Sequence, residues 1–347
     1  MEENNKEELP ENQGNEQKPE KEAPEESFAP RIDLSSLKDK TGRVMEESSK
    51  VLVDMKGHTR IILIAMICEG HVLLEGVPGI AKTLMAKTMA KLIEAEFARL
   101  QFTPDLMPSD VTGTYVFNPK IVEFELKKGP IFTNVVLVDE INRAPAKTQS
   151  ALFEVMEEKQ VTIEGKTNIM PFPFLVLATQ NPIEFEGTYR LPEAQIDRFM
   201  FKILIDYPSE ASEREVLKIK NENPGHTDIS GIKPVISKDD LRKFRSMMYE
   251  VHVEDYLLDY INSIVRSTRH NSQIFLGASP RAAISLLFAS KAYAALEGRD
   301  FVKPEDIHEM ALPALRHRII LTSEIEMEGR TEDEVIRGIM ANIEIPR

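Results

Sequence analysis

The chain has 347 residues, a formal net charge of −14 at pH 7 and 42% hydrophobic residues. This length is enough for two domains with cores, and the hydrophobic fraction is that of an ordinary globular protein. The acidic balance argues against a general electrostatic attraction to nucleic acid or to an anionic membrane surface.

The N-terminal segment is strongly acidic, since residues 1–30 contain ten Glu and three Lys and almost nothing apolar. Such a segment cannot bury enough surface to offset the entropy of ordering, so we predict a disordered tail over residues 1–34. It is interpreted as a solubilising leader or as an arm that docks a partner. It has no apolar stretch typical of a secretory signal, and the longest apolar run, residues 61–68, is far shorter than the ~20 residues that span a bilayer. The one cysteine, Cys68, excludes an internal disulfide, and together these features predict a cytoplasmic chain without membrane insertion.

The next elements alternate between helices and apolar strands. The pattern predicts a helical lead-in over residues 37–69, strands at 71–76, 98–102, 135–140, 174–181 and 199–208, and helices at 83–96 and 146–159. Continuous apolar strands that alternate with helices favour a parallel sheet covered on both faces. We therefore predict an α/β domain over residues 35–208.

Two segments and the C-terminal part depart from this alternation. "VEFEL" (122–126) and "VTIEGKTNIM" (161–170) alternate apolar and polar residues, which is typical of antiparallel hairpins inserted into the α/β core. Residues 209–347 have helical periodicity, and Ser237 and Ser279 are expected to begin helices. This part is predicted to be an all-helical second domain.

The stretch "GVPGIAKT" follows a predicted strand and precedes a predicted helix, as a phosphate-binding loop does. Lys82 is expected to reach the β- and γ-phosphates, and Thr83 to bind Mg²⁺. Ala81 replaces the usual glycine, and we expect its backbone to be already helical, where alanine has no steric cost. The residues predicted to bind nucleotide here are Gly76, Val77, Pro78, Gly79, Ile80, Ala81, Lys82, Thr83 and Leu84.

A second motif, "VVLVDE", places Asp139 and Glu140 at the carboxyl end of a buried strand, where parallel sheets bind ligands. Asp139 can hold Mg²⁺ directly or through water, and Glu140 can orient or deprotonate the attacking water. In "LVLATQNP", Asn181 reaches the same edge and can contact the γ-phosphate or the water, although a polar turn before Pro182 remains an alternative.

Long phrases then reveal a resemblance. "VVLVDEINRAPAKTQSALFEVMEEKQVTI", "LATQNPIEFEGTYRLPEAQIDRF" and "GASPRAAISLL" resemble the MoxR family of AAA+ ATPases, in the helix-2-insert clade, from about residue 51 to the C-terminus. The resemblance implies ATP hydrolysis with Mg²⁺, a ring that is expected to be a hexamer, and a helical lid after the core. It also implies that the two hairpins transmit the nucleotide state to a client protein.

The resemblance further implies roles for three residues. Asn181 matches sensor 1, Arg198 matches an arginine finger that completes the ATP site of a neighbouring subunit, and Arg281 matches sensor 2, which reaches the γ-phosphate from the lid. Without the resemblance, Arg198 could form a surface ion pair and Arg281 could be an ordinary first-turn helix residue. Relatives begin the core with a Gly-Gln pair that contributes to the adenine pocket, whereas this chain has "LVDMKGH" with Asp54 and Met55.

The resemblance implies a chaperone or remodelling motor that acts on protein complexes, often with von Willebrand factor A-domain proteins. Two alternatives are a magnesium-chelatase-like or nucleic-acid-associated motor, and an ATP-binding scaffold with little turnover. The acidic composition disfavours nucleic acid as a partner, and the presence of Asp139, Glu140 and Arg198 disfavours the scaffold.

Overall fold

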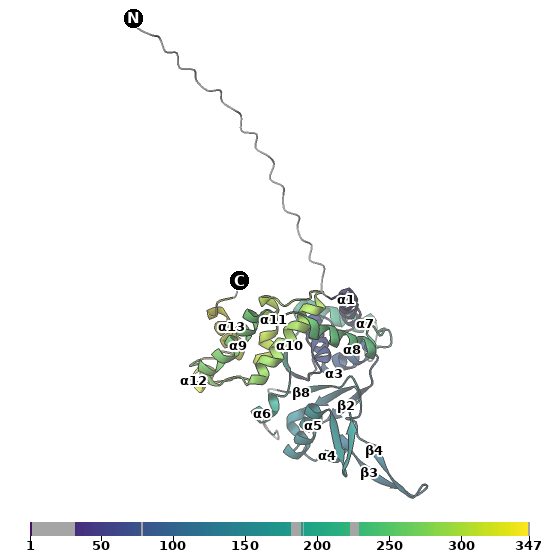
Figure 1. The fold of residues 1–347 in the computed structure, drawn as a ribbon. Helices are drawn as coiled ribbons and strands as arrows, with labels where there is room; N and C mark the ends of the chain where they lie inside the picture. Colours follow the sequence, from purple (N-terminus) through teal and green to yellow (C-terminus); the bar gives the residue numbers. More distant parts are fainter. Residues whose placement is uncertain (2–31, 78, 182–188, 190, 223–228, 346–347) are drawn as a thin grey trace. The chain divides into compact units, whose positions relative to one another are not determined.

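The computed structural model describes Met1 and residues 32–77, 79–181, 189, 191–222 and 229–345. Residues Ile32–Arg347 form one compact unit (Figure 1). Residues 2–31 of the acidic tail, which was predicted over residues 1–34, lie outside the described residues. Leu34 is buried in the core, so the packed chain starts earlier than the predicted boundary.

The centre of the fold is a parallel five-stranded sheet with the strand order β2-β5-β8-β1-β9. Its strands are β1 (Val72–Gly76), β2 (Phe97–Gln101), β5 (Val135–Asp139), β8 (Leu175–Gln180) and β9 (Phe201–Ile205). All five residues of β5 are buried, which explains its unbroken apolar sequence.

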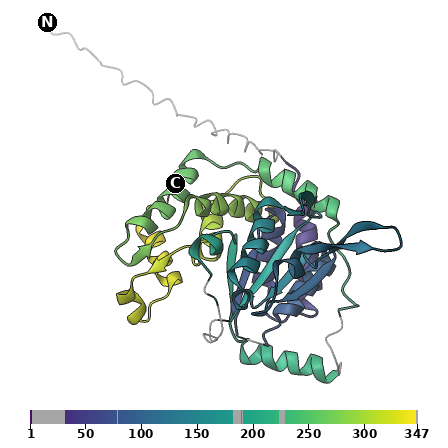
Figure 2. The same ribbon diagram turned by 90° about the horizontal axis from the view of Figure 1, so that it is seen from below.

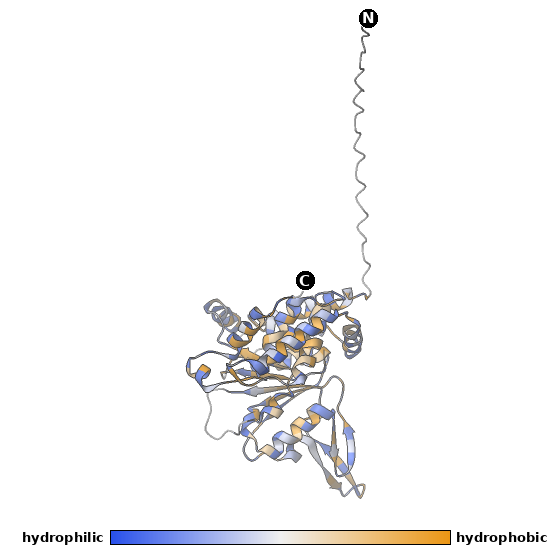
Figure 3. Cartoon of the chain, turned by 60° about the vertical axis from the view of Figure 1, so that its left-hand side comes forward, coloured by the Kyte–Doolittle hydropathy of each residue, from blue (hydrophilic) through white to orange (hydrophobic). Residues whose placement is uncertain are grey.

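Helices cover both faces of this sheet. Alternate residues of β5 belong to different cores, since Val135 and Leu137 pack in one and Val136 and Val138 in the other. The first core contains residues of α1 (Ser35–Ser49), α2 (Lys56–Ile67), α3 (Lys82–Leu92) and the C-terminal helices, and the second contains α5 (Ala146–Glu158). Figure 3 shows helices whose ribbons carry both hydrophobic and hydrophilic residues, as expected where a helix has one buried face.

The two predicted hairpins are present. β3 (Gly113–Asn118) pairs with β4 (Glu123–Lys128), after the short helix α4 (Pro108–Thr112), and β6 (Gln160–Ile163) pairs with β7 (Lys166–Ile169). Figure 2 shows the β3–β4 hairpin extending beyond the sheet. Between the second hairpin and β9 lie β8 and the one-turn helix α6 (Glu193–Ile196).

The C-terminal region is helical, as predicted, with one small addition. It contains α7 (Glu210–Glu222), α8 (Lys238–Glu250), α9 (Asp255–His270), α10 (Pro280–Leu296), α11 (Pro304–Leu315), α12 (Ser323–Met327) and α13 (Glu332–Asn342). Ser237 and Ser279 cap α8 and α10, so both predicted helix starts are confirmed. The addition is a two-stranded antiparallel ribbon of β10 (Ile274–Leu276) and β11 (Ile320–Leu321). One hydrophobic core contains residues from both sides of residue 208, from α1 to α13. The predicted division of the chain into two domains at this residue therefore stays a prediction.

Candidate functional site

The loop between β1 and α3 has two glycines at positions that other residues fill poorly. A Cβ on Gly76 would lie 2.4 Å from the backbone oxygen of Ile205, and Gly79 has a φ of +89°. Both observations agree with a chain that leaves the sheet sharply and turns before the helix. Pro78, which was predicted to be part of this loop, lies outside the described residues.

Ala81 does not have the conformation that we expected from the sequence. Its φ of 57° and ψ of 19° are left-handed, and α3 begins only at the next residue, Lys82. The prediction of a helical backbone at Ala81 is therefore wrong, because this residue belongs to the turn and not to the helix. An L-residue in this region costs about 1–2 kcal/mol, so the alanine is a strained substitute for glycine.

A cavity of about 240 Å³ lies beside this loop at the carboxyl ends of β5 and β8. Lys82 lines it, and its Nζ donates a hydrogen bond to the backbone oxygen of Gly76 at 2.6 Å. Burial lowers the pKa of Lys82, while the carboxylates of Asp139, Glu75 and Glu140 oppose that effect. The residues that line the cavity are Gly79, Ile80, Ala81, Lys82, Thr83, Arg99, Gln101, Asp139, Glu140, Thr179 and Asn181.

The acid pair is held by its neighbours in the sheet. Asp139 is only 8% exposed, and it accepts a hydrogen bond from Arg99 Nε at 2.5 Å and another from Thr179 Oγ1 at 3.2 Å. Thr179 Oγ1 also accepts a bond from the backbone N–H of Glu140 at 2.9 Å, so one hydroxyl bridges both acids.

Glu140 has a left-handed backbone with a φ of 56°, and its carboxylate forms an ion pair with Arg143 at 3.1 Å. Non-glycine residues in this region are uncommon and cluster at functional sites, where the surrounding structure supports the strain. Asn181, the residue directly after β8, lines the same cavity. The structure therefore brings together five predicted residues, Lys82, Thr83, Asp139, Glu140 and Asn181.

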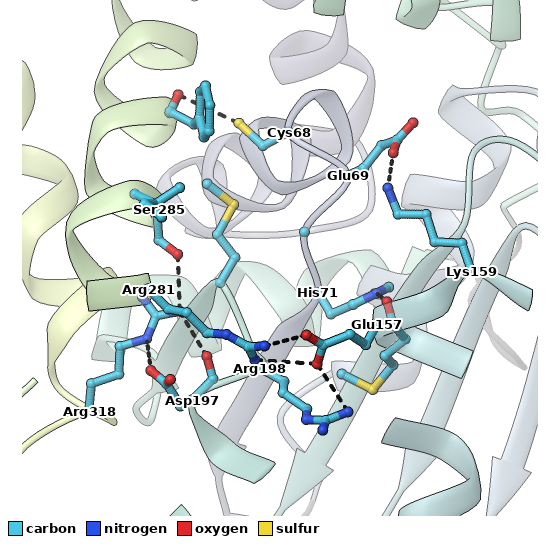
Figure 4. Close-up of a pocket in the computed structure, with 15 residues that line it drawn as sticks. Cys68, Glu69, His71, Glu157, Lys159, Asp197, Arg198, Arg281, Ser285 and Arg318 are labelled. Atoms are coloured by element: carbon cyan, nitrogen blue, oxygen red, sulfur yellow. Dashed lines mark hydrogen bonds and ion pairs between the residues drawn. The ribbon is translucent and has the colours of Figure 1, made fainter. Parts of the chain in front are cut away.

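The two predicted arginines lie elsewhere, in a second cavity of about 280 Å³ that shares no lining residue with the first (Figure 4). Arg198 Nη1 lies 3.1 Å from Glu157 Oε2 and donates to the backbone oxygen of Phe153 at 2.9 Å. Arg281, in the first turn of α10, forms a two-point contact with the same carboxylate. Asp197, beside Arg198, accepts hydrogen bonds from Ser279 and forms an ion pair with the buried Arg318.

A third cavity, of about 590 Å³, adjoins the phosphate loop and is mainly apolar. It shares Gly79, Ile80, Ala81 and Thr83 with the first cavity. Val51, Leu52, Val53, Met55, Leu84, Tyr207, Pro208, Val216 and Ile219 provide the apolar part of its lining. Asp54 is absent from this lining, and its carboxylate accepts a hydrogen bond from Ser212 at 3.1 Å.

Comparisons with known proteins agree with this arrangement. Residues 71–201 match the model of the ATPase family associated with various cellular activities (AAA), and residues 266–339 match the AAA lid domain. YeaC of Bacillus subtilis (strain 168) is 46% identical over 88% of this chain and 94% of its own length. The chaperone MoxR1 of Mycobacterium tuberculosis (strain H37Rv) is 41% identical over 88% of this chain and 82% of its own length. This chain belongs to the MoxR family of AAA ATPases.

A solved structure supports the same conclusion for the MoxR fold. A protein from Cytophaga hutchinsonii superimposes with a TM-score of 0.83 and 45% identity, covering 90% of this chain and 97% of its own. The predicted family is confirmed, and so is the predicted fold of a parallel sheet between helices with a helical region after it.

Sequence reasoning missed Arg99, which lines the first cavity of this MoxR-family chain. Arg99 comes from β2, the neighbour of β5 in the sheet, and contacts Asp139 directly. The signal that could have found it is an arginine within a predicted apolar strand, at a position that parallel pairing brings close to the acid pair.

Among the described helices, each is too short or too polar to cross a membrane.

Proposed function

We propose that this chain binds ATP together with Mg²⁺ and hydrolyses it to ADP and phosphate. One observation carries the proposal: a lysine, a threonine, two acids and an amide line a single cavity beside a glycine-containing loop, and these are Lys82, Thr83, Asp139, Glu140 and Asn181. Membership of the AAA ATPase family supports ATPase activity in general.

The loop and the start of α3 suit the phosphates. The N-terminus of a helix favours an anion, and Lys82 can exchange the backbone oxygen of Gly76 for a phosphate oxygen. Thr83 and Asp139 offer the oxygen ligands that Mg²⁺ prefers, and Mg²⁺ would neutralise charge on the β- and γ-phosphates. Arg99 and Thr179 hold the carboxylate of Asp139 in place, and Glu140 would orient or deprotonate the attacking water.

The apolar cavity is the proposed base site, because it continues from the phosphate loop and has the volume and lining of a small-molecule pocket. Met55 contributes to it, while Asp54, at the departure from the family pattern, is bonded to Ser212. The adenine contacts of this chain are therefore proposed to be mainly apolar.

We predict that Val216→Asp weakens ATP binding at least about tenfold, because it places a charge in the apolar base site. Leu217→Asp is the matched control, since Leu217 is the next residue of α7, is 70% exposed and does not line the cavity. Calorimetric titration should give an unchanged Kd for inorganic triphosphate, which has no base, in both variants. Equal weakening by the two substitutions would contradict the base site.

The arginines support a ring. In one chain, Arg198 and Arg281 line a cavity separate from the phosphate loop, so they could complete an ATP site only if a second copy presents its own site to them. An arginine supplied by a neighbour is an established way to neutralise the transferring phosphoryl group. We propose that both arginines act on the neighbouring subunit in a closed ring, with a hexamer as the family expectation.

The proposed biological role is that of a chaperone or remodelling motor for protein complexes, as the name of the relative MoxR1 suggests, with von Willebrand factor A-domain proteins as candidate partners. The β3–β4 hairpin exposes Val116, Phe117, Ile121, Val122 and Phe124, which is unusual for a surface that faces only water. We propose this hairpin as the client contact. The single cysteine supports a reducing compartment, such as the cytoplasm.

The direct test is steady-state ATP turnover as a function of protein concentration. We expect turnover per subunit to rise with concentration, because a neighbour must supply the arginines, and chelation of Mg²⁺ to abolish it. Turnover that persists in excess chelator would contradict the metal-dependent mechanism, and nucleotide binding without any turnover would favour the scaffold.

A further inference from the structure

The carboxylate of Glu157 is the point at which the two arginines meet. Glu157 Oε2 lies 3.1 Å from Arg198 Nη1 and accepts a hydrogen bond from Arg281 Nη1 at 3.3 Å, while Oε1 accepts a second bond from Arg281. Figure 4 shows both guanidinium groups directed at this carboxylate. One acid therefore joins an arginine beside the sheet to an arginine of α10.

Neither Glu157 nor Arg281 is placed where it would stabilise its own helix. Glu157 lies in the last turn of α5, at the negative end of the helix dipole, and that turn contains no basic residue. Arg281 lies in the first turn of α10, at the positive end, and that turn contains no acidic residue. Residues that break such local rules are expected at functional sites.

The two arginines have like charges, so they repel each other unless an acid lies between them. Within the described residues, the guanidinium of Arg198 forms its hydrogen bond to Phe153 and its ion pair with Glu157 through Nη1. Loss of the carboxylate would leave Arg198 with one backbone contact and Arg281 without its two-point contact. The guanidinium groups would then separate, and at about a third to a half exposed they have room to do so.

We infer that Glu157 is a positioning residue that holds Arg198 and Arg281 together as one unit for the terminal phosphate of the nucleotide bound to a second copy of this chain. The inference rests on the proposed function, since it needs arginines that act between subunits. Glu157 lines neither the first cavity, which is proposed to hold the phosphates, nor the third, which is proposed to hold the base. Its effect is therefore expected in the subunit that supplies the arginines.

The test separates the two sides of a subunit interface. A Glu140→Gln chain keeps both arginines but lacks the catalytic glutamate, whereas an Arg198→Ala chain keeps the glutamate but lacks one of the arginines. In a mixture, ATP is therefore hydrolysed only where an Arg198→Ala chain binds the ATP and a Glu140→Gln chain supplies the arginines. Adding Glu157→Gln to the Glu140→Gln chain should lower the turnover of the mixture about ten- to a hundredfold, with KM for ATP unchanged. Adding Glu157→Gln to the Arg198→Ala chain should leave that turnover unchanged.

Glu158→Gln, at the next residue of α5, is the matched control and should have no effect on either side. It removes the same charge from an exposed glutamate. If Glu157 only stabilised the fold, the substitution would lower turnover on both sides, and that result, or no loss on either side, would overturn the inference. A mixture that stays inactive even with Glu157 intact would instead contradict the arrangement between subunits on which the inference rests.

Discussion

Glu140→Gln is expected to lower ATP turnover by about 10²–10⁴-fold while ATP still binds. The range is that of a general base, because glutamine has nearly the shape of glutamate but cannot accept a proton from water. Lys82, Thr83 and Asp139, which are proposed to bind the phosphates and Mg²⁺, are unchanged in this variant. The measurements are single-turnover hydrolysis for the rate and calorimetric titration for the Kd.

The position of Glu140 explains why the loss should be confined to the chemical step. Its backbone is fixed by the bond from its N–H to Thr179, and its carboxylate contacts Arg143 and not Asp139. Glu158→Gln again serves as the control for the substitution itself. Hydrolysis at the wild-type rate by Glu140→Gln would show that another group activates the water, and loss of binding would show that Glu140 is needed to hold the nucleotide.

Much of the fold could be predicted because the signals are local. The unbroken apolar strand ending at Asp139, the alternation in the two hairpins and the caps at Ser237 and Ser279 depend on residues a few positions apart. The loop and the acids were found in the same way, since each follows directly from a strand in the sequence. Local patterns therefore suffice to single out most of the residues that line the first cavity.

The remaining features depend on tertiary arrangement. Arg99 contacts Asp139 only because β2 and β5 are neighbours in the sheet, although 40 positions separate the two residues in the chain. Ala81 is left-handed because the turn extends to the start of α3, and propensity alone favours the opposite conclusion. The meeting of Arg198 and Arg281 at Glu157 brings a side chain from the start of α10 to the last turn of α5, which no local pattern contains.

Arg198→Ala is expected to lower turnover by at least about 10³-fold, with ATP binding retained, because an arginine supplied to the transferring phosphoryl group has an effect of that size. Arg198 does not line the first cavity, which is proposed to hold the phosphates, so its removal should leave the Kd for ATP unchanged. Turnover and calorimetric titration of the purified variant measure the two effects. Arg337→Ala, which removes an exposed arginine that lines none of the three cavities, controls for the loss of one positive charge.

Mixing variants decides whether Arg198 acts within its own chain or on its neighbour. Arg198→Ala and Glu140→Gln chains are each inactive alone, but at an interface between them one contributes the pocket and the other the arginine. An equimolar mixture should recover about one quarter of the wild-type turnover, because random assembly gives each pocket and each arginine an even chance of being intact. An arginine that acts within its own chain would give no recovery at any ratio, since every chain would then lack one essential group.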